Sequence, residues 1–154
     1  MTIGYVSTRA VDPPVDSLLR FGEVLRSGLA PDGGLYCPDE VPPLPDLESV
    51  TGYAEVARRV MWPYVEGSIE ADHFAAIVAD AYGGFRHPDV CPVHDLGDGL
   101  HLLDLTLGPT LAFKDVGARF MAHLMTSRCR SLNPPIDLFS VNGVMFASII
   151  NTLV

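Results

Sequence analysis

Apolar positions recur at helical spacing through much of the first half of the chain. A helix places residues three and four apart on one face, so this spacing predicts an amphipathic helix wherever it persists. It predicts helices over residues 17–26, 53–64 and 69–82, with a weakly alternating strand over 5–10 before them. Prolines and glycines interrupt the pattern between these segments, including a Pro-rich connector over 38–45. The first part of the chain is therefore predicted to be mostly helical.

The pattern changes to alternation further along the chain. Residues 100–107 place leucines on one face, which predicts a strand. A Gly-Pro pair ends it, a helix follows over 112–128, and a second strand over 136–141 precedes an apolar helix over 144–154. Strand, helix, strand and helix in this order favour a right-handed parallel crossover. The predicted fold class is therefore α/β.

Composition and charge narrow the classes of function. The chain has 154 residues and a net charge of −9, which argues against nucleic acid or an anionic membrane as a partner. No apolar run reaches the roughly 20 residues that span a bilayer, and the first residues do not resemble a signal peptide. The three cysteines are odd in number and widely spaced, so we expect reduced thiols in a cytoplasmic protein.

Cys91, His94 and Asp95 lie close together in a Pro-rich segment and are residue types that bind metal ions. Their spacing matches no metal-binding motif, and the chain contains no CxxC pair. A Cys–His nucleophilic pair would also need a positioned base and a group that orients that base. We therefore predict no metal site and no cysteine nucleophile in this segment.

Lys114 is the only lysine in the chain, and it lies among apolar residues. An amine attacks a carbonyl group only when it is neutral, and burial favours the neutral form. Phe113, Val116 and Phe120 are expected to supply that burial. The ordinary alternative is a lysine in the first turn of a helix, with its charged end in water and its stem along the core.

Residues 108–122, Gly-Pro-Thr-Leu-Ala-Phe-Lys-Asp-Val-Gly-Ala-Arg-Phe-Met-Ala, resemble the cofactor-lysine segment of threonine synthases. Residues 28–38, with a Pro-Asp-Gly-Gly turn, are similar to the N-terminal region of the same family. Threonine synthases are pyridoxal-phosphate (PLP) enzymes of the tryptophan-synthase-β fold type, fold type II. The resemblance implies that Lys114 is the catalytic lysine that binds PLP covalently, and that Thr110 and Asp115 position this lysine or contact the substrate.

The resemblance also implies a division of the chain and a reaction. Residues 1–95 would form a threonine-synthase-like N-terminal domain. Residues 96–154 would form a partial βαβα start of the parallel-sheet PLP domain, which carries the cofactor lysine. In the full-length family, O-phospho-L-homoserine and water are converted to L-threonine and phosphate, a lyase reaction of amino-acid biosynthesis.

The resemblance weakens at the turn after the second predicted strand. The family has Ser-Gly-Asp-Thr-Gly there, at a helix N-terminus that favours an anion, whereas this chain has Ser-Val-Asn-Gly-Val. Ser140, Asn142 and Gly143 are the residues that would contact the cofactor at this turn. Two interpretations remain open: an altered form of that motif, or an internal deletion that joins residues 140–150 to a later family segment.

Later family segments have no counterpart in the chain. We therefore expect a truncated threonine synthase that is inactive alone, with exposed apolar surface that favours self-association. The competing hypothesis is a non-catalytic paralogue that acts, if at all, as a binding or assembly module.

Overall fold

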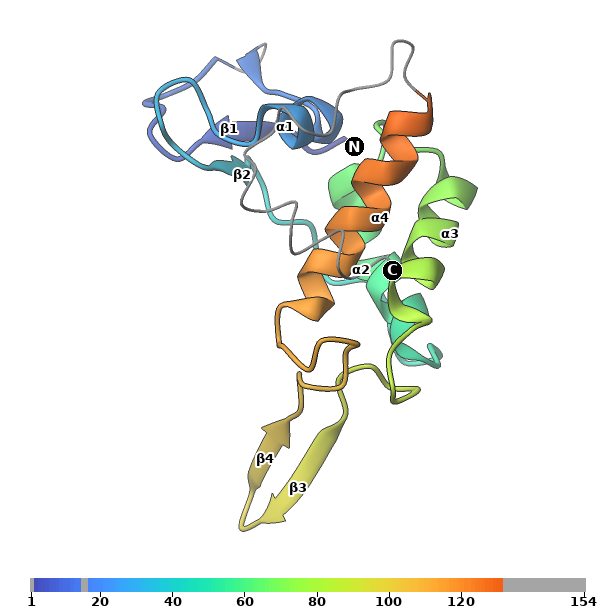
Figure 1. The fold of residues 1–154 in the computed structure, drawn as a ribbon. Helices are drawn as coiled ribbons and strands as arrows, with labels where there is room; N and C mark the ends of the chain where they lie inside the picture. Colours follow the sequence, from blue (N-terminus) through green and yellow to red (C-terminus); the bar gives the residue numbers. More distant parts are fainter. Residues whose placement is uncertain (1, 15–16, 132–154) are drawn as a thin grey trace. The chain divides into compact units, whose positions relative to one another are not determined.

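The computed structural model describes residues 2–14 and 17–131, and side chains as far as residue 126. Short strands and longer helices are interspersed along the chain (Figure 1). The elements are β1 (Tyr5–Ser7), α1 (Phe21–Ser27), β2 (Tyr36–Pro38), α2 (Tyr53–Val65), α3 (Ala71–Tyr82), β3 (Val93–Gly97), β4 (Leu100–Leu103) and α4 (Asp115–Ser131). No helix within the described ranges is long and apolar enough to cross a membrane.

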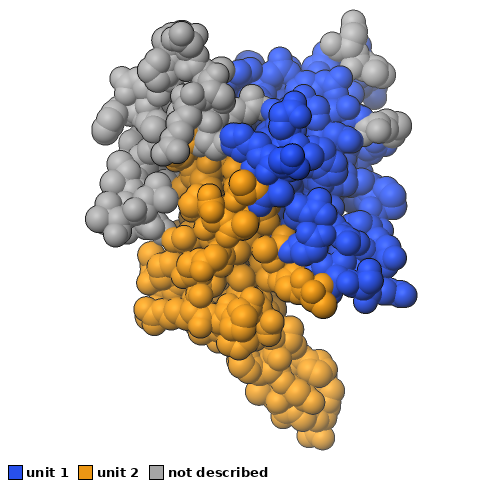
Figure 2. All heavy atoms as spheres, turned by 90° about the vertical axis from the view of Figure 1, so that its right-hand side faces the viewer, with its two compact units in different colours: residues 1–50, 55–75 blue, residues 51–54, 76–154 orange. Residues whose placement is uncertain are grey.

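The chain divides into two compact units (Figure 2). The first unit contains residues 1–50 and 55–75, and the second contains residues 51–54 and 76–154. The predicted domains, residues 1–95 and 96–154, stay a prediction, because compactness alone does not define an independently folding domain.

The first unit is organised around a small antiparallel sheet. In this sheet Tyr5 of β1 lies opposite Pro38 of β2. The Tyr5 ring contacts the Phe21 ring of α1 at 6.0 Å between centroids, and its hydroxyl donates a hydrogen bond of 2.8 Å to the carbonyl of Tyr64 in α2. Burial raises the pKa of Tyr5 to about 12. This tyrosine therefore connects the sheet to two helices.

The described helices follow the predicted ones, but two begin clearly later than predicted. The helix predicted from residue 112 is α4, which begins at Asp115, so Lys114 precedes it. The helix predicted from residue 17 is α1, which begins at Phe21. The reason is that Leu19 exchanges two backbone hydrogen bonds with Tyr5, of 2.9 and 3.0 Å, and so continues the sheet. The helix then begins where the carboxylate of Glu23 accepts a hydrogen bond of 2.7 Å from the Arg20 amide.

Aromatic side chains fill the interior of each unit. In the first unit, Phe74 of α3 is fully buried and contacts Trp62 of α2 at 5.7 Å between ring centroids. In the second unit, the ring of Tyr82 packs edge-on against Tyr53 at 4.9 Å.

The largest departure from prediction lies in the second unit, where β3 and β4 form an antiparallel hairpin (Figure 1). The strand predicted over 100–107 is shorter, and its partner β3 lies in a segment where no strand was predicted. Three residues of the turn, Gly97, Asp98 and Gly99, have positive φ angles. Two of them are glycines, which adopt such angles without strain. Both described sheets are antiparallel. The second predicted strand, 136–141, lies outside the described residues. The parallel crossover predicted between strands 100–107 and 136–141 therefore stays a prediction.

Candidate functional site

Lys114 lies in the turn that leads into α4, immediately before the first helical residue. Its carbonyl accepts a hydrogen bond of 2.8 Å from the amide of Ala118, which makes it the N-cap residue of the helix. Lys114 is exposed, and so is Phe113, at 64%. The expectation that Phe113 and its neighbours bury this lysine is therefore wrong for the described chain. Its amine is accessible to a small molecule in solution.

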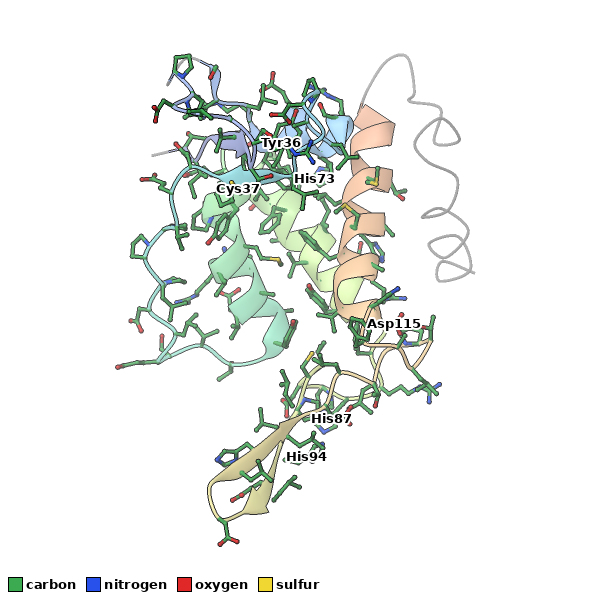
Figure 3. All side chains as sticks on the ribbon, turned by 90° about the vertical axis from the view of Figure 1, so that its left-hand side faces the viewer. Tyr36, Cys37, His73, His87, His94 and Asp115 are labelled. Atoms are coloured by element: carbon green, nitrogen blue, oxygen red, sulfur yellow. The ribbon has the colours of Figure 1, made fainter. Side chains whose placement is uncertain are left out.

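Asp115 follows Lys114 and is the opposite case, because it is only 3% exposed. Figure 3 shows its place at the first turn of α4. Its two carboxylate oxygens accept two hydrogen bonds from Thr110, one of 2.8 Å from the backbone amide and one of 2.6 Å from the hydroxyl. Thr110 and Asp115, two of the predicted site residues, thus contact each other directly. The third, Lys114, lies between them in the sequence.

The backbone of this turn is tightly constrained. Leu111 has a φ of 60°, an uncommon value for a residue other than glycine, and its amide donates a hydrogen bond of 3.1 Å to the carbonyl of Gly108. A Cβ atom at Gly108 would collide with the carboxylate and Cβ of Asp115. Only glycine therefore allows the chain to approach Asp115 this closely.

The segment before the turn is held by hydrogen bonds on both sides. Asp104 accepts two hydrogen bonds from Thr106, 2.7 Å from the hydroxyl and 2.8 Å from the amide. These bonds lower the pKa of the Asp104 carboxyl group. The carbonyl of Leu107 accepts a further bond of 2.9 Å from the amide of Arg86. Residues 104–107 therefore reach the lysine turn in an ordered conformation, although they are not part of a strand.

The remaining predicted site residues, Ser140, Asn142 and Gly143, lie outside the described residues, so their predicted contacts with a cofactor stay predictions. Among the residues the structure describes, no three His, Cys, Asp or Glu side chains converge on a point where a metal ion could bind. Burial raises the pKa of the Cys91 thiol, so this cysteine is protonated at neutral pH.

The sequence indicated Lys114, Thr110 and Asp115 as site residues, but it did not predict the hydrogen bonds between Thr110 and Asp115. The missing information was the role of Gly108, which the sequence analysis treated only as a strand breaker. A glycine beside a buried carboxylate, with a threonine two residues later, is the local pattern that allows this closed turn.

Comparison with known proteins gives a consistent result over most of the chain. A family model described as the threonine synthase N terminus matches residues 4–82. The threonine synthase of Pseudomonas aeruginosa is 42% identical over 125 residues, and that of Schizosaccharomyces pombe is 39% identical over 127 residues. These matches cover 79% of this chain but only 26% and 24% of the two relatives, so the chain spans about a quarter of their length.

The fold agrees with solved structures of the same kind. A PLP-bound threonine synthase from Brucella melitensis is 39% identical in sequence and superposes with a TM-score of 0.75. The match covers 84% of this chain and 28% of that protein. This likeness confirms the predicted α/β class, with its mixture of helices and strands.

Proposed function

Because the chain belongs to the threonine synthase family, we propose that it supplies Lys114 as the residue that holds pyridoxal phosphate in a threonine synthase site. The observation that carries this proposal is the position of Lys114. It is the chain's only lysine, and it stands exposed at the N-cap of α4 within the Gly-Pro-Thr-Leu-Ala-Phe-Lys-Asp turn. The matching structure from Brucella melitensis is described as PLP-bound.

The proposed reaction is the conversion of O-phospho-L-homoserine and water to L-threonine and phosphate. PLP, when bound, supplies an electron sink that stabilises negative charge on the substrate carbons. The contribution of this chain is an amine at Nζ of Lys114, which binds the cofactor and then holds or releases a proton near the substrate. We place this role in the cytoplasm, with a small-molecule substrate rather than nucleic acid.

The described residues give an aldehyde access to the amine of Lys114, although they do not supply the burial that would favour its neutral form. Lys114 is exposed, so an aldehyde can reach its amine. The only other amine in the chain is the N-terminus, because every other cationic side chain is an arginine or a histidine. Ser140, Asn142 and Gly143 are the residues we propose for contact with the cofactor phosphate.

The direct test is to incubate the chain with PLP, reduce it with borohydride and map the labelled peptide. We expect the phosphopyridoxyl group on Lys114, and no label at this position in Lys114→Ala. The matched control is Lys114→Arg, which keeps the positive charge but has no primary amine. Label on the N-terminal peptide alone, in the unaltered chain, would contradict the proposal.

A second test addresses turnover. We expect the 154-residue chain with excess PLP to release no phosphate from O-phosphohomoserine above background, because catalysis requires groups that surround and position the substrate. The described turn leaves Lys114 exposed and provides no such enclosure. Turnover that depends on Lys114 would show that this chain alone carries the complete activity.

A second candidate function is association through apolar surface, and the hairpin favours it. Its large apolar side chains are between 51% and 63% exposed: Val93, Leu96, Leu100, Leu102 and Leu103. Exposed apolar surface of this kind is typical of interaction sites. If the chain self-associates through the hairpin, Leu102→Ser should reduce the associated fraction in sedimentation velocity experiments. Leu44→Ser, which alters an exposed leucine in the Pro-rich connector, should not.

A further inference from the structure

We propose that Thr110 and Asp115 are positioning residues, whose paired hydrogen bonds close the turn and fix the place from which Lys114 extends. We call the two hydrogen bonds between these residues the Thr110–Asp115 clamp. The inference rests on the proposed role of Lys114, because positioning has a purpose only if this lysine binds something.

The first argument is that Asp115 is buried and that each of its two oxygens already accepts a hydrogen bond. Both of its oxygens accept hydrogen bonds from Thr110, and the residue is 3% exposed. A buried carboxylate is tolerated only when it is hydrogen-bonded, so losing these bonds would carry a high cost. A substrate would have to reach a carboxylate that is only 3% exposed and already hydrogen-bonded to Thr110. The geometry therefore favours a role within the turn over direct contact with substrate.

The second argument is that the clamp encloses Lys114. It connects the two residues that bracket the segment 111–114, so the backbone between them forms a closed loop. Within that loop Leu111 has a positive φ, and the amide of Asp115 donates a bond of 3.0 Å to the carbonyl of Ala112. Each constraint removes backbone conformations that would otherwise be lost when a ligand binds. A lysine held in this way meets a bound cofactor at lower entropic cost.

The chain contains a natural comparison for this clamp. Asp104 accepts the same two kinds of hydrogen bond from Thr106, with similar lengths of 2.7 and 2.8 Å. That pair lies in the same unit but does not enclose the lysine. Removing the hydroxyl of Thr106 also deletes a hydrogen bond from a hydroxyl to a carboxylate, but that bond is exposed to water and lies outside the segment around Lys114.

The experiment compares Thr110→Val with Thr106→Val, and uses Thr110→Ser to restore the hydroxyl. Amide hydrogen exchange over residues 110–115 measures how often the turn opens. The PLP concentration that gives half-maximal borohydride-trapped label on Lys114 measures positioning. Labelling of Lys114 by trinitrobenzenesulfonate measures whether the amine remains chemically accessible, because this reagent needs no particular geometry of the turn.

In Thr110→Val we expect exchange over residues 110–115 to accelerate by about fivefold or more, since one hydrogen bond to a carboxylate is lost. We expect the half-saturating PLP concentration to rise by a similar factor, about fivefold. Thr106→Val and Thr110→Ser should stay within about twofold of the unaltered chain in both measurements. Trinitrobenzenesulfonate labelling should be equal in all four proteins.

Two results would overturn the inference. One is equal exchange over residues 110–115 in Thr110→Val and Thr106→Val, which would show that the clamp does not hold the turn. The other is faster exchange in Thr110→Val with unchanged PLP labelling, which would leave the clamp a purely structural role. If the unaltered chain takes no PLP at Lys114, the proposed function fails, and the exchange comparison alone decides whether the clamp holds the turn.

Discussion

Adding one methyl group at Gly108 and at Gly117 should change the stability of the chain in opposite directions. Gly117 lies inside α4, and a Cβ atom built there meets nothing within 4 Å. A Cβ atom at Gly108 would instead collide with the side chain of Asp115. The same substitution, glycine to alanine, therefore tests helix propensity at one site and steric fit at the other.

The magnitudes follow from these surroundings. Alanine is favoured over glycine in a helix interior by about 1 kcal/mol. Gly117 lies in the first turn of α4, so this value is an upper bound, and Gly117→Ala should raise the melting temperature by at most about 2 to 4 °C for a chain of this size. Gly108→Ala must move the Asp115 carboxylate and strain its bonds to Thr110. Overpacking costs about 1 to 3 kcal/mol, so Gly108→Ala should lower the melting temperature by about 2 to 12 °C.

The assay is thermal unfolding followed by far-ultraviolet circular dichroism, with amide exchange in α4 as a second measurement. The double variant should lie between the two single variants. An unchanged melting temperature in Gly108→Ala would refute the close approach of Gly108 to Asp115. A lower melting temperature in Gly117→Ala would refute the open surroundings assigned to that position.

Three further substitutions test individual interactions. Hydrogen bonds from Arg58 and Arg59 lower the pKa of Glu55 from 4.5 to about 2, so Glu55 stabilises the fold above pH 4.5 and this contribution is lost as the pH falls toward 2. Glu55→Gln should therefore flatten the decline of melting temperature across that window. Burial lowers the pKa of His123 from 6.5, so the unfolded chain takes up a proton first and stability falls below pH 6.5; His123→Gln should reduce that fall in melts at pH 5 and pH 8. Tyr5→Phe removes a part-buried hydrogen bond, which should cost about 1 kcal/mol in urea unfolding, and no loss would contradict that bond.

The helices could be predicted well because their apolar positions repeat at close range. The periodicity placed a helix over 53–64 and another over 69–82, and the structure has α2 over Tyr53–Val65 and α3 over Ala71–Tyr82. The start of α1 was wrong because Leu19 pairs with Tyr5, which is fourteen residues earlier in the chain. Local periodicity contains no information about such a partner.

The hairpin shows the same limit more strongly. Its first strand contains histidine, aspartate and glycine, and its side chains are exposed on both faces, so no alternation marks it. The strand exists because β4 supplies its hydrogen bonds, which is a property of the pair and not of either sequence.

The sequence predicted which residues form the candidate site. It did not predict how they are arranged in the turn. Lys114 stood out because it is unique in the sequence, and Thr110 and Asp115 stood out because they flank it. The exposure of Lys114 and the burial of Asp115 depend on how the turn folds. Neighbours in sequence can point to opposite environments at a helix start, and residue type alone does not decide which one faces water.

Because Lys114 is exposed and Asp115 is buried, proteolysis can measure how often this turn opens. A lysine-specific endoproteinase has a single bond to cut in the whole chain, the bond between Lys114 and Asp115. A protease binds its substrate in an extended conformation, and here one side of that bond is exposed while the other is buried and hydrogen-bonded. Cleavage therefore waits until the turn opens, and when opening and closing are fast, its rate follows the open population. The rate at which two fragments appear on a gel, divided by the cleavage rate of an unstructured peptide of the same sequence, thus gives the opening free energy of the turn without any label.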